Sequence, residues 1–520
     1  MDKSTPKMNR GIAPRLLKSS FFWTLVRGGF LAAMVWTLSV MWNRWNIPDL
    51  EAADPLMYTN LGNTLFWVVW MMGLVLLAPA AGRAWCAVCP LGALNEVVSR
   101  WGLARPFPRI LRNDYTKTMF LLLTLVLLGQ FRIHHYPGAT ALFLAGWTGL
   151  ALISGALFSG RSLCAWLCPV GGMLNLYSRT APVGVTVRDL ETCEECENRE
   201  CVTGSERWIQ VALGRLRSAI RLRDYPCPVN LKVWDMKGSG RCLLCLNCMR
   251  ACPYDNVQIS ARTPVAPLWT ERYPRFSEIF MAAVLMGFLL LSYSRFWPGL
   301  ESVLAFPIAS LSGVIGPAAS RTAYIVWVGF VLPMLLLLAP SMAVVGSGLM
   351  SPQGAPDVPG TAGEKGAFPV RFWLGPSSRE TRVDDDEDGE RILTRTGTIG
   401  GLAAACLPTI IPLLLAAHLV LAVVKVNAKA GYLALGLADP TGVQSYLAVE
   451  ELGLYPRPGL LLSMGAIKGL AVFFMAGGIL LSLLAVARIT GREDVPFLPF
   501  ALQTAVAGFC FTGGLVKWLF

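Results

Sequence analysis

The sequence predicts a polytopic all-α membrane protein of about nine transmembrane helices, with one polar domain inserted between them. Of its 520 residues, 54% are hydrophobic and only 15% are charged, against about 25% charged in an average soluble domain. The mean hydropathy is +0.51, and the apolar residues fall in blocks of about 20, enough to cross a hydrocarbon core of about 30 Å. These observations exclude a soluble globular enzyme and a disordered or fibrous chain.

Nine apolar blocks are long enough to be transmembrane helices. They lie at residues 21–42, 62–82, 118–134, 140–159, 277–294, 322–345, 398–424, 462–487 and 496–516. A further block at 298–318 contains Glu301, Pro307 and Pro317, so we expect an interfacial or re-entrant segment there.

The loop charges predict an orientation. Five basic residues precede the first block, so the positive-inside rule keeps the N-terminus in the cytoplasm, behind an uncleaved first span. The loop at 43–60 is acidic, whereas 90–117 and 179–275 are rich in arginine, which agrees with alternating spans. We attribute the net charge of +12 to these loops and to contact with membrane lipid, and expect no nucleic acid as a partner.

Six segments follow from this pattern. They are an N-terminal cytoplasmic segment with the first anchor (1–60), a tandem two-helix repeat (61–179), a cytoplasmic polar domain (180–275), transmembrane helices with an interfacial segment (276–348), a flexible acidic loop (349–396) and C-terminal transmembrane helices (397–520).

The tandem repeat is visible in the sequence itself, because GRAWCAVCPLG (82–92) recurs as GRSLCAWLCPVG (160–171). Two spans per unit return the chain to the same face, so both cysteine pairs should lie at the cytoplasmic side of a pseudo-two-fold axis. Cys86, Cys89, Cys164 and Cys168 are therefore candidate ligands of a shared metal centre. The alternative is that they are small buried hydrophobic residues in two independent turns. Disulfides are the least favoured option in a reducing compartment.

The polar domain contains CLLCLNCMRACP (242–253), a spacing typical of ferredoxins that bind two 4Fe–4S clusters. In such a run three thiolates hold one cluster and the fourth reaches the other. A looser partner set precedes it, and with the usual crossing the two clusters divide the eight cysteines. One cluster has Cys193, Cys196, Cys201 and Cys252, and the other has Cys242, Cys245, Cys248 and Cys227. Zinc is an alternative for the first half alone.

Residues 205–225 interrupt this domain with apolar residues that alternate with arginines. We interpret the insertion as a basic amphipathic helix lying on anionic headgroups. The alternative is an ordinary solvated helix.

Over residues 60–260 the chain resembles the membrane polyferredoxins of the NapH, NosR and CcoG type. The resemblance rests on WCAVCP (85–90), LCAWLCP (163–169) and the cysteine run at 242–253. It implies a bacterial inner-membrane protein that passes electrons between the quinone pool, or a cytoplasmic donor, and a partner oxidoreductase. Others of this type serve in assembling copper or quinone-cofactor enzymes. The first turn departs from the second by one residue between its cysteines, and the last 245 or so residues match nothing in the family.

Three histidines are the remaining candidate cofactor contacts. His134 and His135 follow the third span, and His418 lies in the seventh; they could contact quinol or ligate haem b near the outer face. An interfacial turn explains the adjacent pair more simply than haem b does.

We therefore predict an iron–sulfur electron-transfer protein with two 4Fe–4S clusters, a third centre at the repeat cysteines, and a quinone or partner oxidoreductase as its redox partner. No residues form an acid–base or nucleophilic constellation, so any enzymatic role would be that of a quinol dehydrogenase subunit. The alternative is a maturation factor that supplies electrons for metal or cofactor insertion. A transporter with a regulatory iron–sulfur domain is less favoured, because few charges lie within the spans.

Overall fold

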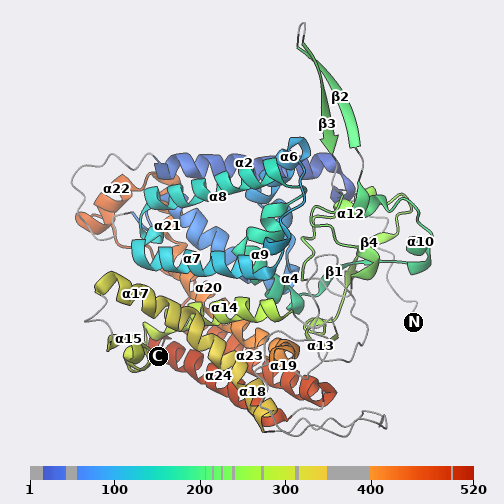
Figure 1. Ribbon diagram of the computed structural model, residues 1–520. Coiled ribbons are helices and arrows are strands. Elements are labelled where there is room, and N and C mark those ends of the chain that lie inside the picture. The colour runs from blue at the N-terminus through green and yellow to red at the C-terminus, as the bar shows by residue number, and fades with distance from the viewer. Residues whose placement is uncertain are drawn as a thin grey trace, which may run out of the picture.

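The computed structural model describes residues 16–42, 56–204, 206–213, 216–223, 226–236, 240–270, 275–310, 316–347, 399–493 and 496–519. Most of these residues are helical, and the long helices form one bundle with a cysteine-rich segment (residues 180–275) at one end (Figure 1). The predicted acidic loop at 349–396 lies outside the described residues.

Eight helices of the described part are long and apolar enough to cross a membrane. They are α2 (Ser20–Trp42), α3–η1–α4 (Leu61–Ala81), α8 (Pro137–Leu157), α14 (Phe276–Ser294), α17–η7–α18 (Pro317–Gly346), α20 (Ile411–Lys429), α23 (Met464–Glu493) and α24 (Phe497–Leu519). Each corresponds to one predicted span. The ninth prediction corresponds to α7 (Asp114–Phe131), which has only 18 residues and two charges in its first turn; it packs along α14 and α17.

Shorter helices complete the bundle. Helix α15 (Pro298–Ala309) has 12 residues and is about 18 Å long, too short to span, so its interfacial placement stays a prediction. The predicted seventh span is interrupted: α19 (Ile399–Cys406) and the 3₁₀ turn η8 (Leu407–Thr409) precede α20. Further short connections include η2 (Arg109–Leu111), η3 (Ile133–His135), α13 (Pro267–Thr270), α21 (Tyr432–Ala438), α22 (Val443–Tyr446) and η9 (Leu447–Glu451).

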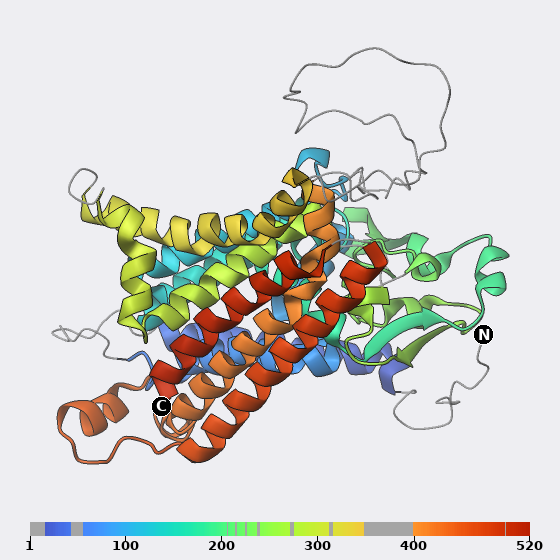
Figure 2. The same ribbon diagram turned by 90° about the horizontal axis from the view of Figure 1, so that it is seen from below.

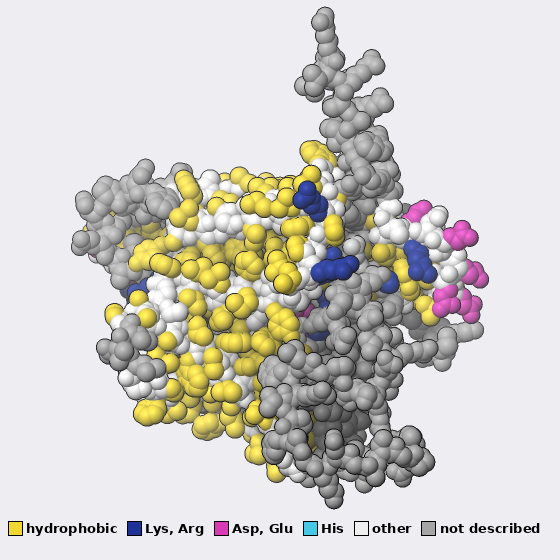
Figure 3. Space-filling model, viewed as in Figure 1, with side chains coloured by type: hydrophobic (Ala, Val, Ile, Leu, Met, Phe, Trp, Pro, Cys, Tyr) yellow, Lys and Arg dark blue, Asp and Glu magenta, His cyan; other side chains and the backbone are white. Residues whose placement is uncertain are grey.

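Helices α14 and α20 lie in the centre of the bundle, with 72% of each span buried. Figure 2 shows the C-terminal helices α23 and α24 (orange-red and red) side by side, and α23 packs against α20 of this core. The face of the bundle seen in Figure 3 carries many hydrophobic side chains, whereas acidic side chains gather at the far end of the cysteine-rich segment. An apolar face of this kind suits a hydrocarbon surround.

The cysteine-rich segment is built on two antiparallel strands, β1 (Val183–Val187) and β4 (Val257–Ala261). Between them lie the short helices α10 (Leu190–Glu194), α11 (Glu200–Thr203), η6 (Val233–Asp235) and α12 (Asn247–Ala251). Because β1 pairs with β4, the early and the late cysteines are brought together at one end of this small sheet.

The amphipathic helix predicted at 205–225 is wrong. The structure has an antiparallel hairpin there, β2 (Glu206–Leu213) and β3 (Leu216–Arg223), with Leu213 paired to Leu216. The insertion alternates with period two and has Gly214-Arg215 between its halves, a pattern that favours a two-residue hairpin over a helix of period 3.6. The hairpin projects away from the bundle (Figure 1), so it supplies no membrane-surface helix.

A buried ion pair joins the repeat to the central helix. Arg179 Nη2 lies 2.6 Å from Glu278 Oε2, and both side chains are less than a tenth exposed. Asn175 donates to the other oxygen of the same carboxylate at 2.9 Å. The carboxylate therefore compensates a charge that the apolar surround would otherwise disfavour.

Replacing Glu278 by alanine should lower the free energy of unfolding by about 3–5 kcal/mol, because a buried arginine would lose its partner. Chemical unfolding of the full chain in detergent measures this. In the control, Arg457→Ala removes one partner of a largely exposed pair with Glu450 and should change stability by only about 0–1 kcal/mol. Equal effects of the two changes would contradict the role of burial.

Candidate functional site

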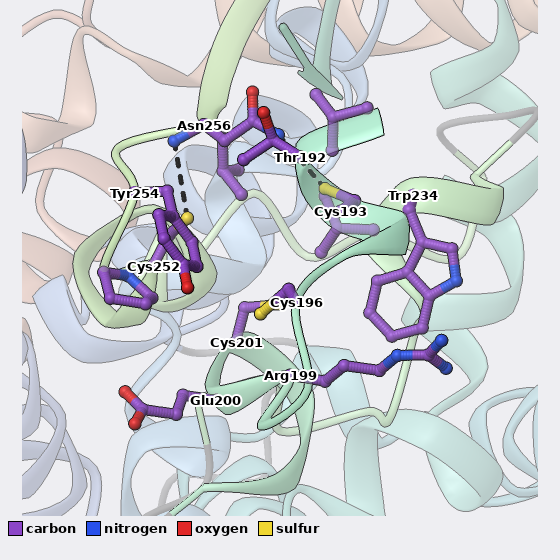
Figure 4. A pocket seen from close by; sticks show the side chains of 14 residues that line it. Thr192, Cys193, Cys196, Arg199, Glu200, Cys201, Trp234, Cys252, Tyr254 and Asn256 are labelled. Carbon is purple, nitrogen blue, oxygen red and sulfur yellow. Dashed lines mark hydrogen bonds between the residues drawn. The ribbon is translucent and has the colours of Figure 1, made fainter. Parts of the chain in front are cut away.

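Two pockets in the cysteine-rich segment are each lined by four cysteines. The first pocket is lined by Cys193, Cys196, Cys201 and Cys252, and the second pocket by Cys227, Cys242, Cys245 and Cys248. Figure 4 shows Cys193, Cys196 and Cys252 around the first pocket, with Tyr254 beside Cys252 and Trp234 on the Cys193 side. The grouping of the cysteines is the crossed one that the spacing predicts; cluster binding by these residues remains a proposal.

Backbone and amide N–H groups point at several of these sulfurs. The Asn256 side chain donates to Cys193 Sγ at 3.2 Å, and its backbone N–H donates to Cys252 Sγ at 3.4 Å (Figure 4). In the second pocket, the Leu231 N–H donates to Cys227 Sγ at 3.1 Å. Such N–H groups stabilise negative charge on sulfur and tune the potential of an iron–sulfur cluster.

The backbone around the second pocket is bent by two residues with positive φ, Leu244 (+50°) and Leu246 (+58°). This conformation is uncommon for a side chain larger than glycine. It wraps residues 242–248 around the pocket so that their thiols face inward. Burial raises the pKa of Cys227 to about 12 and that of Cys242 to about 11, and the neighbouring Cys245 thiolate acts in the same direction. Bare thiolates are therefore unfavourable here, and a bound cation centre would relieve their repulsion.

A 4Fe–4S cluster and a single metal ion require different arrangements of the donor atoms. Tetrahedral zinc at 2.3 Å from each sulfur would draw four thiolates to within about 4 Å of one another. Among the residues that the structure describes, no three Cys, His, Asp or Glu side chains converge in that way. In a 4Fe–4S cluster each thiolate binds a different iron, so the sulfurs surround a volume. The two four-cysteine pockets fit this requirement.

The repeat places its cysteines at equivalent helix boundaries. Cys86 lies in α5 (Ala84–Val88) and Cys89 caps α6 (Pro90–Trp101). Cys164 lies in the π-helical turn η4 (Leu163–Leu167), and Cys168 caps α9 (Pro169–Tyr177). Both capping cysteines precede a proline at the first helical position, which suits the fixed φ of that residue.

The π turn explains why the second cysteine pair has one more intervening residue than the first. The Cys168 N–H donates to the Leu163 carbonyl oxygen at 2.8 Å, five residues back, so the wider turn absorbs the extra residue. Such turns occur often at functional sites. Although the second motif has one more residue between its cysteines, both capping cysteines therefore keep the same position before a proline.

The repeat thiols (Cys86, Cys89, Cys164 and Cys168) lie within electrostatic reach of one another. Burial, together with smaller contributions from the charges of Cys168 and Cys86, raises the pKa of Cys89 to about 12. The pKa of Cys164 is raised well above its usual value by burial and by the same neighbours. The structure thus brings together the four cysteines that the sequence repeat singles out.

Two glycines allow close packing at the repeat thiols. A Cβ on Gly92 would lie 3.0 Å from Cys164 Sγ, and one on Gly171 would lie 3.2 Å from the Cys164 carbonyl oxygen. These glycines occupy equivalent repeat positions, each at the third residue of the helix that follows a capping cysteine. A side chain at Gly92 would press on the Cys164 sulfur, and one at Gly171 would press on the Cys164 backbone, so both glycines permit close packing around the repeat cysteines.

The two repeat turns dock the cysteine-rich segment. Gly82 (φ +57°) and Gly160 (φ +66°) begin the equivalent turns. Next to them, Arg83 Nη1 donates to the Gly240 carbonyl oxygen at 2.8 Å, and the Arg161 N–H donates to the Pro228 carbonyl oxygen at 2.8 Å. Because Pro228 follows Cys227 and Gly240 precedes Cys242 by two residues, the second pocket is fixed directly against the repeat.

The three histidines lie elsewhere. The Asn63 side chain donates to the His134 carbonyl oxygen at 3.0 Å, which places His134 at the start of α3–η1–α4, and the cysteines follow its other end. The rings of His134 and His135 are 4.1 Å apart. The His418 ring nitrogen Nδ1 is 3.1 Å from the Tyr177 hydroxyl, inside the bundle. His418 therefore has its own partner, and its contact with quinol or haem is an untested prediction.

Sequence reasoning missed the polar residues between the sites. Glu96 and Arg161 are almost completely buried, and Arg161 donates to a Glu96 oxygen at 2.7 Å. Burial alone would raise the pKa of Glu96, but the charges of Arg161, Arg27 and Arg100 outweigh it and lower the pKa to about 2. Arg161 belongs to the repeated GR dipeptide, and that repetition was the available signal.

Gly160→Ala should loosen the docking of the cysteine-rich segment, because φ is positive and the new Cβ would lie 2.5 Å from the Pro228 oxygen. We expect about 1–3 kcal/mol of strain, measured as faster amide hydrogen exchange at residues 160–162, 227 and 229–231. Gly146→Ala is the control, since nothing lies within 4 Å of its Cβ position. Unchanged exchange in the Gly160 variant would show that the turn does not hold the segment.

A family model described as a 4Fe-4S binding domain matches residues 63–107 and 140–187. Each matched stretch contains one cysteine pair of the repeat. An uncharacterised protein of Methanocaldococcus jannaschii is 23% identical over 197 residues, which is 36% of this chain and 69% of that relative. No solved structure matches the chain significantly. The chain is thus a mostly helical protein with several apolar helices of membrane-spanning length and a 4Fe–4S binding domain.

Proposed function

We propose that this protein is a bacterial inner-membrane electron-transfer protein with three iron–sulfur centres. Two 4Fe–4S clusters would occupy the first and second pockets, and the repeat thiols would hold the third centre. The protein would pass single electrons between the quinone pool, or a cytoplasmic donor, and a partner oxidoreductase, as the resemblance to the NapH, NosR and CcoG type suggests. The N-terminus and the cysteine-rich segment would face the cytoplasm.

One observation carries this proposal: cysteines of all three sites belong to a single apolar cluster. Cys164 of the repeat, Cys245 and Cys248 of the second pocket, and Cys201 and Cys252 of the first pocket pack within it. Separate structural metal sites would have no need of a shared, water-poor surround. Centres that exchange electrons benefit from such a surround, because a short distance between the centres and a low reorganisation energy favour electron transfer.

The order of the centres follows from their neighbours. Burial raises the pKa of Cys248 well above its usual value; the other second-pocket thiolates act in the same direction, and so does Cys201 of the first pocket. The second pocket is fixed to the repeat turns through Pro228 and Gly240. The second pocket would therefore hold the middle centre, and the first pocket would hold the centre farthest from the repeat turns.

The iron content tests the number of centres. Anaerobically purified full chain should contain about 12 irons and 12 acid-labile sulfides if each site holds a 4Fe–4S cluster. Cys164→Ser should remove about four irons and one signal from the electron paramagnetic resonance (EPR) spectrum of the reduced protein, because the remaining three thiols no longer complete the centre. Cys510→Ser, in the distant helix α24, is the control. If the parent protein contains only about eight irons and Cys164→Ser contains the same number, only the two pockets hold clusters and the third centre is contradicted.

The maturation factor is the second candidate, and turnover separates it from a respiratory subunit. If electrons enter from the quinone pool, a quinol analogue should reduce the EPR-detected centres as fast as a respiratory chain turns over. Stopped-flow bleaching of the iron–sulfur absorbance in vesicles measures this rate. Reduction over many minutes, or only by strong low-potential donors, would contradict the quinol route and favour assembly.

A further inference from the structure

A buried chain of polar groups links the second pocket to the repeat thiols. Asn247, adjacent to Cys248, donates its side-chain N–H to Glu96 Oε1 at 3.4 Å. Arg161 Nε donates to Glu96 Oε2 at 2.7 Å, and Arg161 Nη1 donates to the Cys86 carbonyl oxygen at 2.8 Å. Three side chains therefore join the backbone of one proposed ligand set to the backbone of the other.

Burial of this chain is nearly complete. Arg161 is 0% exposed and Glu96 is 1% exposed. Replacing a buried ion pair by apolar residues is often neutral or stabilising, so such a pair is weak evidence of a purely structural role. The Glu96–Arg161 pair lies between the repeat thiols and the second pocket, a position that suits a role in the chemistry of these thiols.

The local charge is positive on balance. Arg27 and Arg100 also approach Glu96, at 3.6 Å and 3.1 Å, so a single carboxylate faces three guanidinium groups. Burial acts to lower the pKa of Arg161, but Glu96 outweighs it and raises that pKa, with Cys164 and Cys245 as further contributors. The guanidinium is thus charged, and it faces thiols of two different sites.

The equivalent arginine of the first repeat unit has the same relation. Arg83 is 3% exposed, and its Nη2 lies 3.2 Å from the Cβ position of Gly171, beside Cys168. Its hydrogen bond to the Gly240 oxygen holds it near Cys242. Each repeat arginine therefore reaches across to the glycine of the other unit, and each lies between a repeat thiol and the second pocket.

We propose that Arg161, held by Glu96, and its counterpart Arg83 are positioning residues that couple the second-pocket centre to the centre at the repeat thiols and set their potentials. One electron passes between the two centres: one is oxidised, the other is reduced, and no bond or proton changes place. The fixed positive charge stabilises the reduced, more negative state on either side. This rests on the proposed function, in that the repeat thiols hold a redox centre.

Charge variants with opposite signs test the coupling. Arg161→Gln should make reduction of the repeat-thiol centre less favourable by about tenfold, which is about 59 mV for a one-electron couple. Glu96→Gln should shift it in the opposite direction, because it removes the compensating negative charge. The double variant should return close to the parent potential. EPR-monitored redox titration of the full chain measures all three.

Two further variants separate charge from folding. Arg161→Lys keeps the charge and should keep the potential near the parent value even if its hydrogen bonds weaken. Arg457→Gln removes an exposed charge outside this network and should leave every potential unchanged. If Arg161→Gln loses its iron, the potential of Glu96→Gln still tests the coupling, because its shift should have the opposite sign to that expected for Arg161→Gln.

The outcomes also separate this inference from the proposed function. Three EPR signals with no shift, or with shifts of the same sign in both single variants, would overturn the coupling and leave the electron-transfer function intact. A parent protein without a signal from the repeat thiols would overturn both the third centre and the coupling.

Discussion

Compensation of buried negative charge on sulfur is the constraint on which the rest of this structure depends. Twelve cysteines gather at one end of an apolar bundle, and thiolates in such a surround are costly unless they are paired or bound to a cation. Arg83 and Arg161 bring positive charge into the same region, and Glu96 fixes the orientation of one guanidinium. The repeat therefore supplies both the thiols and the charges that make their burial tolerable.

Helix boundaries convert this requirement into geometry. Each capping cysteine sits where one helix ends and a proline starts the next, so its sulfur lies at a helix N-terminus, where backbone N–H groups and the helix dipole favour negative charge. The Gly171 N–H donates to Cys168 Sγ at 3.4 Å. The long helices thus bring the thiols to one end of the bundle, and the short helices that follow stabilise them there.

Sequence alone predicted the parts that depend on local spacing. The grouping of Cys252 with Cys193, Cys196 and Cys201 followed from the cysteine spacing, and eight of the nine predicted apolar blocks correspond to helices long enough to cross a membrane. The hairpin at 206–223 was missed because alternating arginines were read at helical period. The repeated GR dipeptide marks Arg161, but its pairing with Glu96 could not be predicted, since Glu96 has no counterpart in the second repeat unit and 65 residues separate the two.

The placement of His134 limits what the thiols can do without another cofactor. His134 is tied to the start of α3–η1–α4, and the repeat thiols follow its end, 21 residues later, which is about 30 Å along a helix. Electron transfer decays steeply with distance, so no direct step joins the two ends. Donor and acceptor must therefore both approach the end of the bundle that carries the cysteines, unless a bound group within the spans divides the distance.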